Sequence, residues 1–208
     1  MYDVWGREYF IHHTSYLVHK LFRTFASPNM YYIVTQVVDK SAVDSPGLDS
    51  PREEVLKLYG NRLRLRVCGL YREGDQLLMV RHRGIGPTNI FWCPPGGGAQ
   101  FGETAPEALI REFIEETGLE VEIGGMLFVN EFMLPPLHAL ELFFEVRAVS
   151  GVIRQGIDPE MSADGQIIQE VRLMSFDEIK SYPPNEVHDL FRYCESMDDV
   201  FKLKGYLQ

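Results

Sequence analysis

Three glutamates spaced like one face of a helix, Glu112, Glu115 and Glu116, are the residues of this sequence most suited to chemistry. At about 100° of rotation per residue, their side chains share one side of a helix. None of them has a lysine or arginine at i+4, although like charges at this spacing cost about 0.2–0.5 kcal/mol per pair. Clustered carboxylate oxygens suit Mg²⁺ or Mn²⁺. The cluster therefore predicts a metal site whose ion cancels the repulsion and receives a diphosphate.

The helix that must position these carboxylates is specified by its two ends. Thr104 and Glu107 have the spacing of a capping box, and Pro106 is tolerated in the first turn because the backbone there lacks helical partners. Gly118 supplies a left-handed cap at the other end. These signals predict a helix over residues 104–117.

The side of this helix opposite the carboxylates is apolar. Ile110, Phe113 and Ile114 fall there, and we expect them to pack against the core. The preceding loop, PPGGGAQFGE, is rich in glycine, which would let its backbone approach an ion or a phosphate closely. The loop and the helix together predict a rigid carboxylate platform.

Composition limits the classes of partner. The chain of 208 residues has a net charge of −10, which argues against binding to a nucleic-acid backbone. Its three cysteines are widely spaced and form no CxxC pair, so we expect neither disulfides nor a zinc site, and a reducing cytoplasm. No stretch is long and apolar enough for a membrane span or a leader peptide. We expect no membrane partner.

The chain is expected to form one principal domain with an extension. The polar segment DKSAVDSPGLDSPREE has the composition of a linker, so we predict an extension and linker over residues 1–60 and a domain over residues 61–208. Within the extension, MYYIVTQVV has strand character. Its many aromatic residues would form an unusual apolar surface if exposed, which favours a homodimer.

Strand patterns dominate the predicted domain. LRLRVCGLY and QLLMV flank the turn REGD and predict a hairpin. Further strands are expected over residues 121–133, 138–149 and 169–175. A short capped helix follows from Ser175, and NEVHDLFRYCESM has amphipathic helical spacing. These elements predict an α/β (α+β) domain.

The glutamate helix and its loop resemble the Nudix box. Gly97, Glu103 and the run Arg111 to Leu119, REFIEETGL, match that pattern at its constrained positions. The resemblance implies a Nudix fold, a mixed β-sheet sandwiched between helices that carries a loop-helix-loop box. It also implies that Glu112, Glu115 and Glu116 bind the metal ions, with the carbonyl of Gly96 as a further ligand.

The same resemblance assigns further roles. Glu103 and Arg111 would form a buttress in which the arginine fixes the rotamers of the box carboxylates. Together with Glu115 they make up the expected catalytic apparatus of the box. Families of this kind often recruit a general base from a loop after the sheet, where Asp158, Glu160 and Asp164 are the available acids. Glu160 ranks first because the turn-rich stretch DPE can hold its side chain toward the site. The alternative is that all three are ordinary loop acids without a catalytic role.

Residues outside the box offer substrate contacts. Arg81 and Arg83 could steer phosphates, and Glu131 or Phe132 could hold a base or ribose, although Phe132 would serve core packing equally well. Pro135 lies sixteen residues after Leu119, where ADP-ribose pyrophosphatases of this family tend to carry a proline. Other residues are expected to be structural or without a site: His138, Cys93, His12, His13 and His19.

The sequence therefore predicts a pyrophosphohydrolase dependent on Mg²⁺ or Mn²⁺. Its substrate would be a nucleoside diphosphate linked to another moiety, X, with a nucleoside diphosphate sugar such as ADP-ribose favoured. The products would be a nucleoside monophosphate and phosphorylated X. Oxidised nucleoside triphosphates and dinucleoside polyphosphates are alternative substrates, and a non-catalytic ligand sensor or scaffold is an alternative function.

Overall fold

The computed structural model describes residues 51–208. The strand expected at MYYIVTQVV, and His12, His13 and His19, lie outside the described residues. The elements, in chain order, are α1 (Pro51–Tyr59), β1 (Arg62–Glu73), β2 (Gln76–His82), β3 (Phe91–Cys93), β4 (Gly96–Gly98), α2 (Ala105–Thr117), β5 (Leu119–Leu134), β6 (Leu137–Gly151), β7 (Ile168–Ser175), α3 (Phe176–Ser181), the 3-10 helix η2 (Asp189–Tyr193), α4 (Met197–Lys202) and β8 (Gly205–Leu207).

The strands form a mixed sheet in the order β3-β2-β1-β6-β5-β8, with β4 paired to β1 and β7 paired to β2. Strand β1 runs parallel to β6 from Arg62 to Tyr71 and then turns back into β2. Gly74, with φ of 59°, occupies the two-residue turn of this predicted hairpin. The two strands expected over residues 121–133 and 138–149 form the long antiparallel β5–β6 hairpin.

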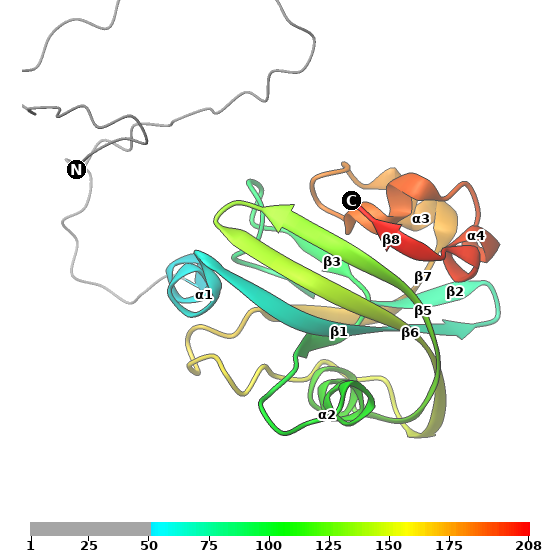
Figure 1. Ribbon diagram of the computed structural model, residues 1–208, viewed down its shortest axis with the longest axis horizontal. Helices are drawn as coiled ribbons and strands as arrows, with labels where there is room; N and C mark the ends of the chain where they lie inside the picture. Colours follow the sequence, from blue (N-terminus) through cyan, green and yellow to red (C-terminus); the bar gives the residue numbers. More distant parts are fainter. Residues whose placement is uncertain (1–50) are drawn as a thin grey trace, which may run out of the picture. The chain divides into compact units, whose positions relative to one another are not determined.

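Helices cover both faces of the sheet (Figure 1). On one face, Leu109 and Phe113 of α2 pack against strand residues such as Val67 and Val146. On the other face, the C-terminal helices contribute Leu190 and Phe191 to a second apolar cluster. This arrangement confirms the predicted mixed sheet between helices.

The C-terminal segment departs from its prediction in detail. Leu190, Phe191 and Cys194 are fully buried, as their spacing predicts. Instead of a regular amphipathic helix, however, the chain forms only the short 3-10 helix η2, begun by His188, whose Nδ1 accepts the N–H of Leu190 at 3.1 Å. Buried polar contacts of His188 thus take precedence over helical periodicity here.

Helix α1 lies inside the segment that the sequence predicts as extension and linker. Its first residue is Pro51, and acidic residues in the first turn and Lys57 in the last complement the helix dipole. Val55 and Tyr59 are buried against Val80 of the sheet. The helix therefore belongs to the packed domain, which begins before residue 61.

Among residues 51–208, no helix has the length and apolar character needed to cross a bilayer.

Candidate active site

Helix α2 forms with the predicted caps. The hydroxyl of Thr104 accepts the N–H of Glu107, the Glu107 carboxylate accepts the N–H of Thr104, and Gly118 closes the helix in the left-handed conformation with φ of 72°. These caps satisfy backbone groups that the helix itself leaves open. The helix is thereby held as a rigid carrier for the box residues.

The orientation of α2 corrects one expectation. Ile114, expected in the core, is 45% exposed, whereas the carboxylate-bearing Glu112 and Glu116 are only 9% and 5% exposed. The buried side of the helix combines these two acids with Leu109 and Phe113. The carboxylate face is therefore not opposite the core, because two of the three acids point into the protein toward β4.

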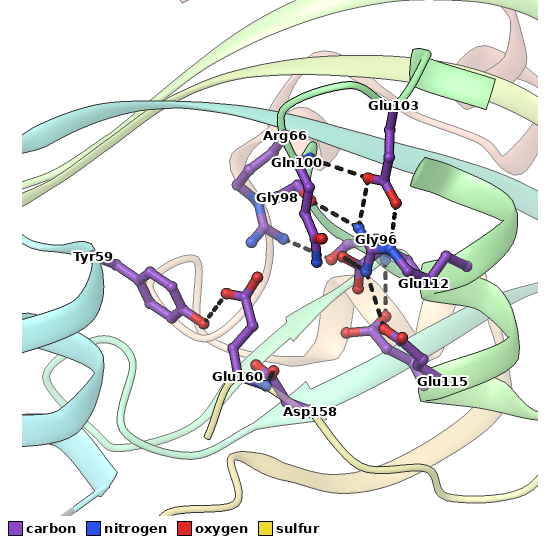
Figure 2. Close-up of polar contacts among 12 residues, drawn as sticks. Tyr59, Arg66, Gly96, Gly98, Gln100, Glu103, Glu112, Glu115, Asp158 and Glu160 are labelled. Atoms are coloured by element: carbon purple, nitrogen blue, oxygen red, sulfur yellow. Dashed lines mark hydrogen bonds and ion pairs between the residues drawn. The ribbon is translucent and has the colours of Figure 1, made fainter. Parts of the chain in front are cut away.

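Arg111 links three carboxylates, those of Glu103, Glu112 and Glu115, which are labelled in Figure 2. Its Nε and Nη2 donate to the two oxygens of Glu103 at 2.8 and 3.0 Å. Its Nη1 donates to Glu112 at 2.9 Å and to Glu115 at 3.0 Å, while Nη2 also donates to the carbonyl of Gly98 at 3.1 Å. Arg111 and the N–H of Gln100 hold the pKa of Glu103 at about 2. Arg111 therefore lies where it can fix the rotamers of three carboxylates.

Glu116 is held differently. One of its oxygens accepts the N–H of Gly96 at 2.8 Å, and the other lies 3.6 Å from Nε2 of His82. Burial and the negative charge of Glu116 raise the pKa of Glu112 to about 8. A Cβ atom on Gly97 would lie 2.3 Å from the Glu112 carboxylate, so a larger residue there would displace that carboxylate. The carboxylates of Glu112 and Glu116 thus both lie against the backbone of Gly96 and Gly97.

The donor set suits a hard divalent cation. Glu112 and Glu115 each give one oxygen to Arg111, and Glu116 gives one to the Gly96 N–H. Each carboxylate keeps a second oxygen outside these bonds. Within residues 51–208, no three His, Cys, Asp or Glu side chains are already gathered around a single point. Burial and the Glu116 charge together raise the pKa of Glu112, and a bound cation would relieve the repulsion between these acids.

A cavity opens beside Gly96 and Glu116. Arg66, on β1, donates to the Gly96 carbonyl at 2.9 Å and to Glu141 at 3.2 Å. His188 contacts the other oxygen of Glu141 at 2.7 Å. Burial would raise the pKa of Glu141, but His188 and Arg66 outweigh it and lower that pKa. This buried network shapes the cavity and holds the carbonyl that the sequence assigns to the metal.

A second arginine of β1 also lines the cavity. The guanidinium of Arg64 stacks over the ring of Tyr59 at 3.7 Å. Burial lowers the pKa of Arg64 to about 10, which leaves it protonated at neutral pH. In the part of the chain that the structure describes, no carboxylate or carbonyl accepts a hydrogen bond from it. Arg64 is therefore a cation with donors available to an anion in the cavity.

The predicted loop acids occupy different places. Glu160 and Asp158 lie near Tyr59 and opposite the box carboxylates (Figure 2). Asp158 lines the cavity, and burial raises its pKa. Asp164 is exposed, and its backbone carbonyl accepts from Arg83 at 3.0 Å. The structure brings Asp158 and Glu160 to the site and leaves Asp164 outside it.

The predicted substrate contacts are mostly displaced from the cavity. Arg81 lies 3.6 Å from Glu170 and beside the Trp92 ring, on the face of β2 opposite to His82, because successive strand residues point to opposite faces. Glu131 is paired with His138 at 2.8 Å and with Tyr206. Arg81 therefore does not line the cavity beside the box, and its surroundings do not support the expected phosphate contact.

Phe132 borders the cavity beside the box, whereas Pro135 does not. Phe132 lines the cavity, and its ring stacks on that of His188 with centroids 5.8 Å apart. Pro135 lies at the tip of the β5–β6 hairpin and lines a separate groove with Arg52 and Leu56. Of these two positions, only the aromatic one borders the cavity beside the box.

Several cavity residues carry no recognisable sequence signal. Tyr59, His82 and His188 come from distant segments and meet only through the fold. Arg64 and Arg66 did have a signal, since LRLRV places them two residues apart on one strand face. Two charged residues on one face of a predicted strand can line a polar cavity, and that alternation could have identified them.

A family model for the NUDIX domain matches residues 60–193, more than half of the chain. The chain belongs to the Nudix family. The family predicted from the box is thereby confirmed.

Individual relatives agree with this assignment. An ADP-ribose pyrophosphatase of Methanocaldococcus jannaschii is 29% identical over 94 residues, covering 44% of this chain and 55% of the relative. The chain thus spans about half the length of this relative. A NUDIX hydrolase structure from Nitrosomonas europaea matches with a TM-score of 0.56 and 21% identity, covering 69% of this chain and 93% of that one. A UDP-X diphosphatase structure matches with a TM-score of 0.54 and 20% identity, covering 74% and 72%. The two structures establish the fold.

Proposed function

We propose that this Nudix protein hydrolyses a nucleoside diphosphate linked to another moiety, with ADP-ribose or a similar nucleoside diphosphate sugar as substrate. The observation that carries the proposal is the box itself, with Glu112, Glu115 and Glu116 beside Arg111 at the edge of a cavity. The products would be a nucleoside monophosphate and phosphorylated X. The similarity to the ADP-ribose pyrophosphatase of Methanocaldococcus jannaschii supports the choice of sugar nucleotide.

Glu112, Glu115, Glu116 and the Gly96 carbonyl would hold Mg²⁺ or Mn²⁺. A bound ion of this kind neutralises phosphoryl oxygens and lowers the pKa of water. Arg111 keeps the carboxylates in place, and Arg64 offers its donors to a phosphate oxygen of the substrate. The protein's own cations thus assist in binding an anion to an acidic chain.

Glu160 is our candidate for the general base. Its Oε2 accepts the hydroxyl of Tyr59 at 2.8 Å, and its main-chain N–H donates to Asp158 at 2.9 Å. The other carboxylate oxygen, Oε1, has no such partner among the described residues and is available to take a proton from water. Asp158 accepts that N–H within the turn and so helps to aim Glu160, which is why we rank Glu160 first.

A small nucleotide panel tests the function. With Mg²⁺, ADP-ribose should be cleaved faster than nucleoside triphosphates, oxidised nucleoside triphosphates or dinucleoside polyphosphates, and excess chelator should abolish turnover. Chromatography measures the release of AMP and ribose 5-phosphate. A triphosphate cleaved fastest would replace the proposed substrate. No turnover of any nucleotide, combined with nucleotide binding, would favour the non-catalytic sensor or scaffold instead.

A further inference from the structure

The loop that carries Asp158 and Glu160, residues 152–167, is attached at its beginning to the box helix. The N–H of Arg154 donates to the carbonyl of Thr117 at 2.9 Å, and the N–H of Gly156 donates to that of Glu116 at 2.8 Å. These carbonyls belong to the last turn of α2, where the helix provides no partner for them. The loop therefore starts from a point set by the helix that bears the box carboxylates.

The far half of the same loop is attached to helix α1. The Glu54 carboxylate accepts the N–H of Ser162 at 2.7 Å and the hydroxyl of Ser162 at 2.8 Å. Val55 of α1 belongs to one buried cluster with Met161 and Ile167 of the loop. Hydrogen bonds and apolar packing thus join α1 to the loop on the side opposite to α2.

Between these attachments, Glu160 is held at two points. The Asp158 carboxylate fixes its main chain through the 2.9 Å bond, and the Tyr59 hydroxyl fixes its carboxylate through the 2.8 Å bond. Tyr59 is itself buried, with the guanidinium of Arg64 stacked on its ring. Figure 2 shows the Tyr59 hydroxyl and the Glu160 carboxylate directed toward each other. An exposed loop glutamate would otherwise sample several rotamers.

We propose that helix α1 is a working part of the catalytic site, in which Tyr59 is a positioning residue that aims the carboxylate of Glu160. Glu54 supports the same role by holding the loop at Ser162. The inference rests on the proposed hydrolase function with Glu160 as base. Tyr59 acts on Glu160 through its hydroxyl, so loss of that hydroxyl lowers the rate of the chemical step, while the ring that stacks on Arg64 keeps substrate binding unchanged.

Tyr59→Phe in the full chain removes one oxygen atom and keeps the buried ring. With Mg²⁺ and the substrate cleaved best in the nucleotide panel, we expect kcat to fall about tenfold with KM unchanged, and Glu160→Gln to lower kcat by about a hundredfold or more. In the double variant, Tyr59→Phe should add no further loss. Tyr71→Phe is the matched control, because the Tyr71 hydroxyl also contacts a carboxylate, Glu73 at 3.3 Å, on an exposed surface.

Amide hydrogen exchange of the loop gives a reading independent of turnover. Tyr59→Phe and Glu54→Gln should each speed exchange in residues 156–166, and Tyr71→Phe should not. Wild-type kcat in Tyr59→Phe, or losses that simply multiply in the double variant, would overturn the positioning role. If no nucleotide is cleaved, the proposed hydrolase function fails, and unchanged loop exchange would then overturn the attachment to α1 as well.

Discussion

At the scale of a single residue, Glu112 shows how the box carboxylates repel one another. It is buried beside Glu116, and its pKa of about 8 lies well above the ordinary 4.5. Arg111 offsets part of the repulsion through a 2.9 Å bond. A group whose pKa is raised on folding binds a proton more tightly in the folded state. Ionising it therefore destabilises the metal-free protein, progressively as the pH rises from 4.5 through 8.

The first prediction concerns metal binding and pH. Mg²⁺ requires the ionised carboxylate, so its binding must release the Glu112 proton below the pKa of about 8. The rise in Tm caused by excess Mg²⁺ should therefore be small near about pH 6 and larger near about pH 9. Melting curves with Mg²⁺ and with chelator across this range provide the measurement.

Glu112→Gln is the matched variant for this test. It keeps the shape of the side chain and removes the titrating charge. In chelator, its Tm should decline less than that of the parent between about pH 5 and about pH 8, because the parent alone gains an unfavourable charge there. Its response to Mg²⁺ should be weak at every pH. A Mg²⁺ response in the parent that stays constant with pH would contradict the assignment of Glu112 as a ligand.

At the scale of elements, the place of each arginine along its strand decides whether it reaches the cavity. Arg64, on β1, lines the cavity without a protein acceptor among the described residues, whereas Arg81, on β2, lies beside Glu170 and the Trp92 ring and does not line it. Arg64→Gln should raise KM for ADP-ribose by roughly ten- to a hundredfold, equivalent to losing a charged hydrogen bond of about 1.5–3 kcal/mol. Steady-state kinetics measure this change.

Arg81→Gln provides the comparison for Arg64→Gln. Its KM and kcat should stay close to those of the parent, because its side chain lies outside the cavity. Equal effects of the two substitutions would show that lining the cavity does not separate binding from non-binding arginines. A larger effect of Arg81→Gln would restore the role that the sequence suggests for it.

The elements also show what the sequence could and could not predict. Capping residues, strand alternation and the box spacing act locally, so α2, the β1–β2 hairpin and the buttress residues Glu103 and Arg111 could be found from short stretches. The partner of Glu160 could not, because Tyr59 is 101 residues away in the chain. The side of α2 that faces inward was likewise hidden, since two buried carboxylates override the apolar pattern.

At the scale of the whole molecule, catalysis and stability share the same contacts around α1. Val55 and Tyr59 pack with sheet residues and with the loop, and Glu54 and Tyr59 bind that loop through hydrogen bonds. The sequence alone predicts residues 1–60 as an extension and linker outside the domain that carries the box. The structure divides that segment, because residues 51–59 hold the loop that bears the candidate base.

Two truncations test this division. Deleting residues 1–50 should leave kcat/KM for ADP-ribose close to that of the full chain, and any homodimer that depends on the extension should dissociate, as sedimentation would show.

Deleting residues 1–60 should lower kcat by at least the roughly tenfold expected for Tyr59→Phe, because the whole attachment of the loop is lost. It should also lower Tm, since burying side chains such as Val55 and Tyr59 stabilises the fold by about 1.5–3 kcal/mol each. Folding of the shorter chain, verified by circular dichroism, separates loss of positioning from loss of structure. A folded 61–208 fragment with full kcat would show that the loop keeps its geometry without α1.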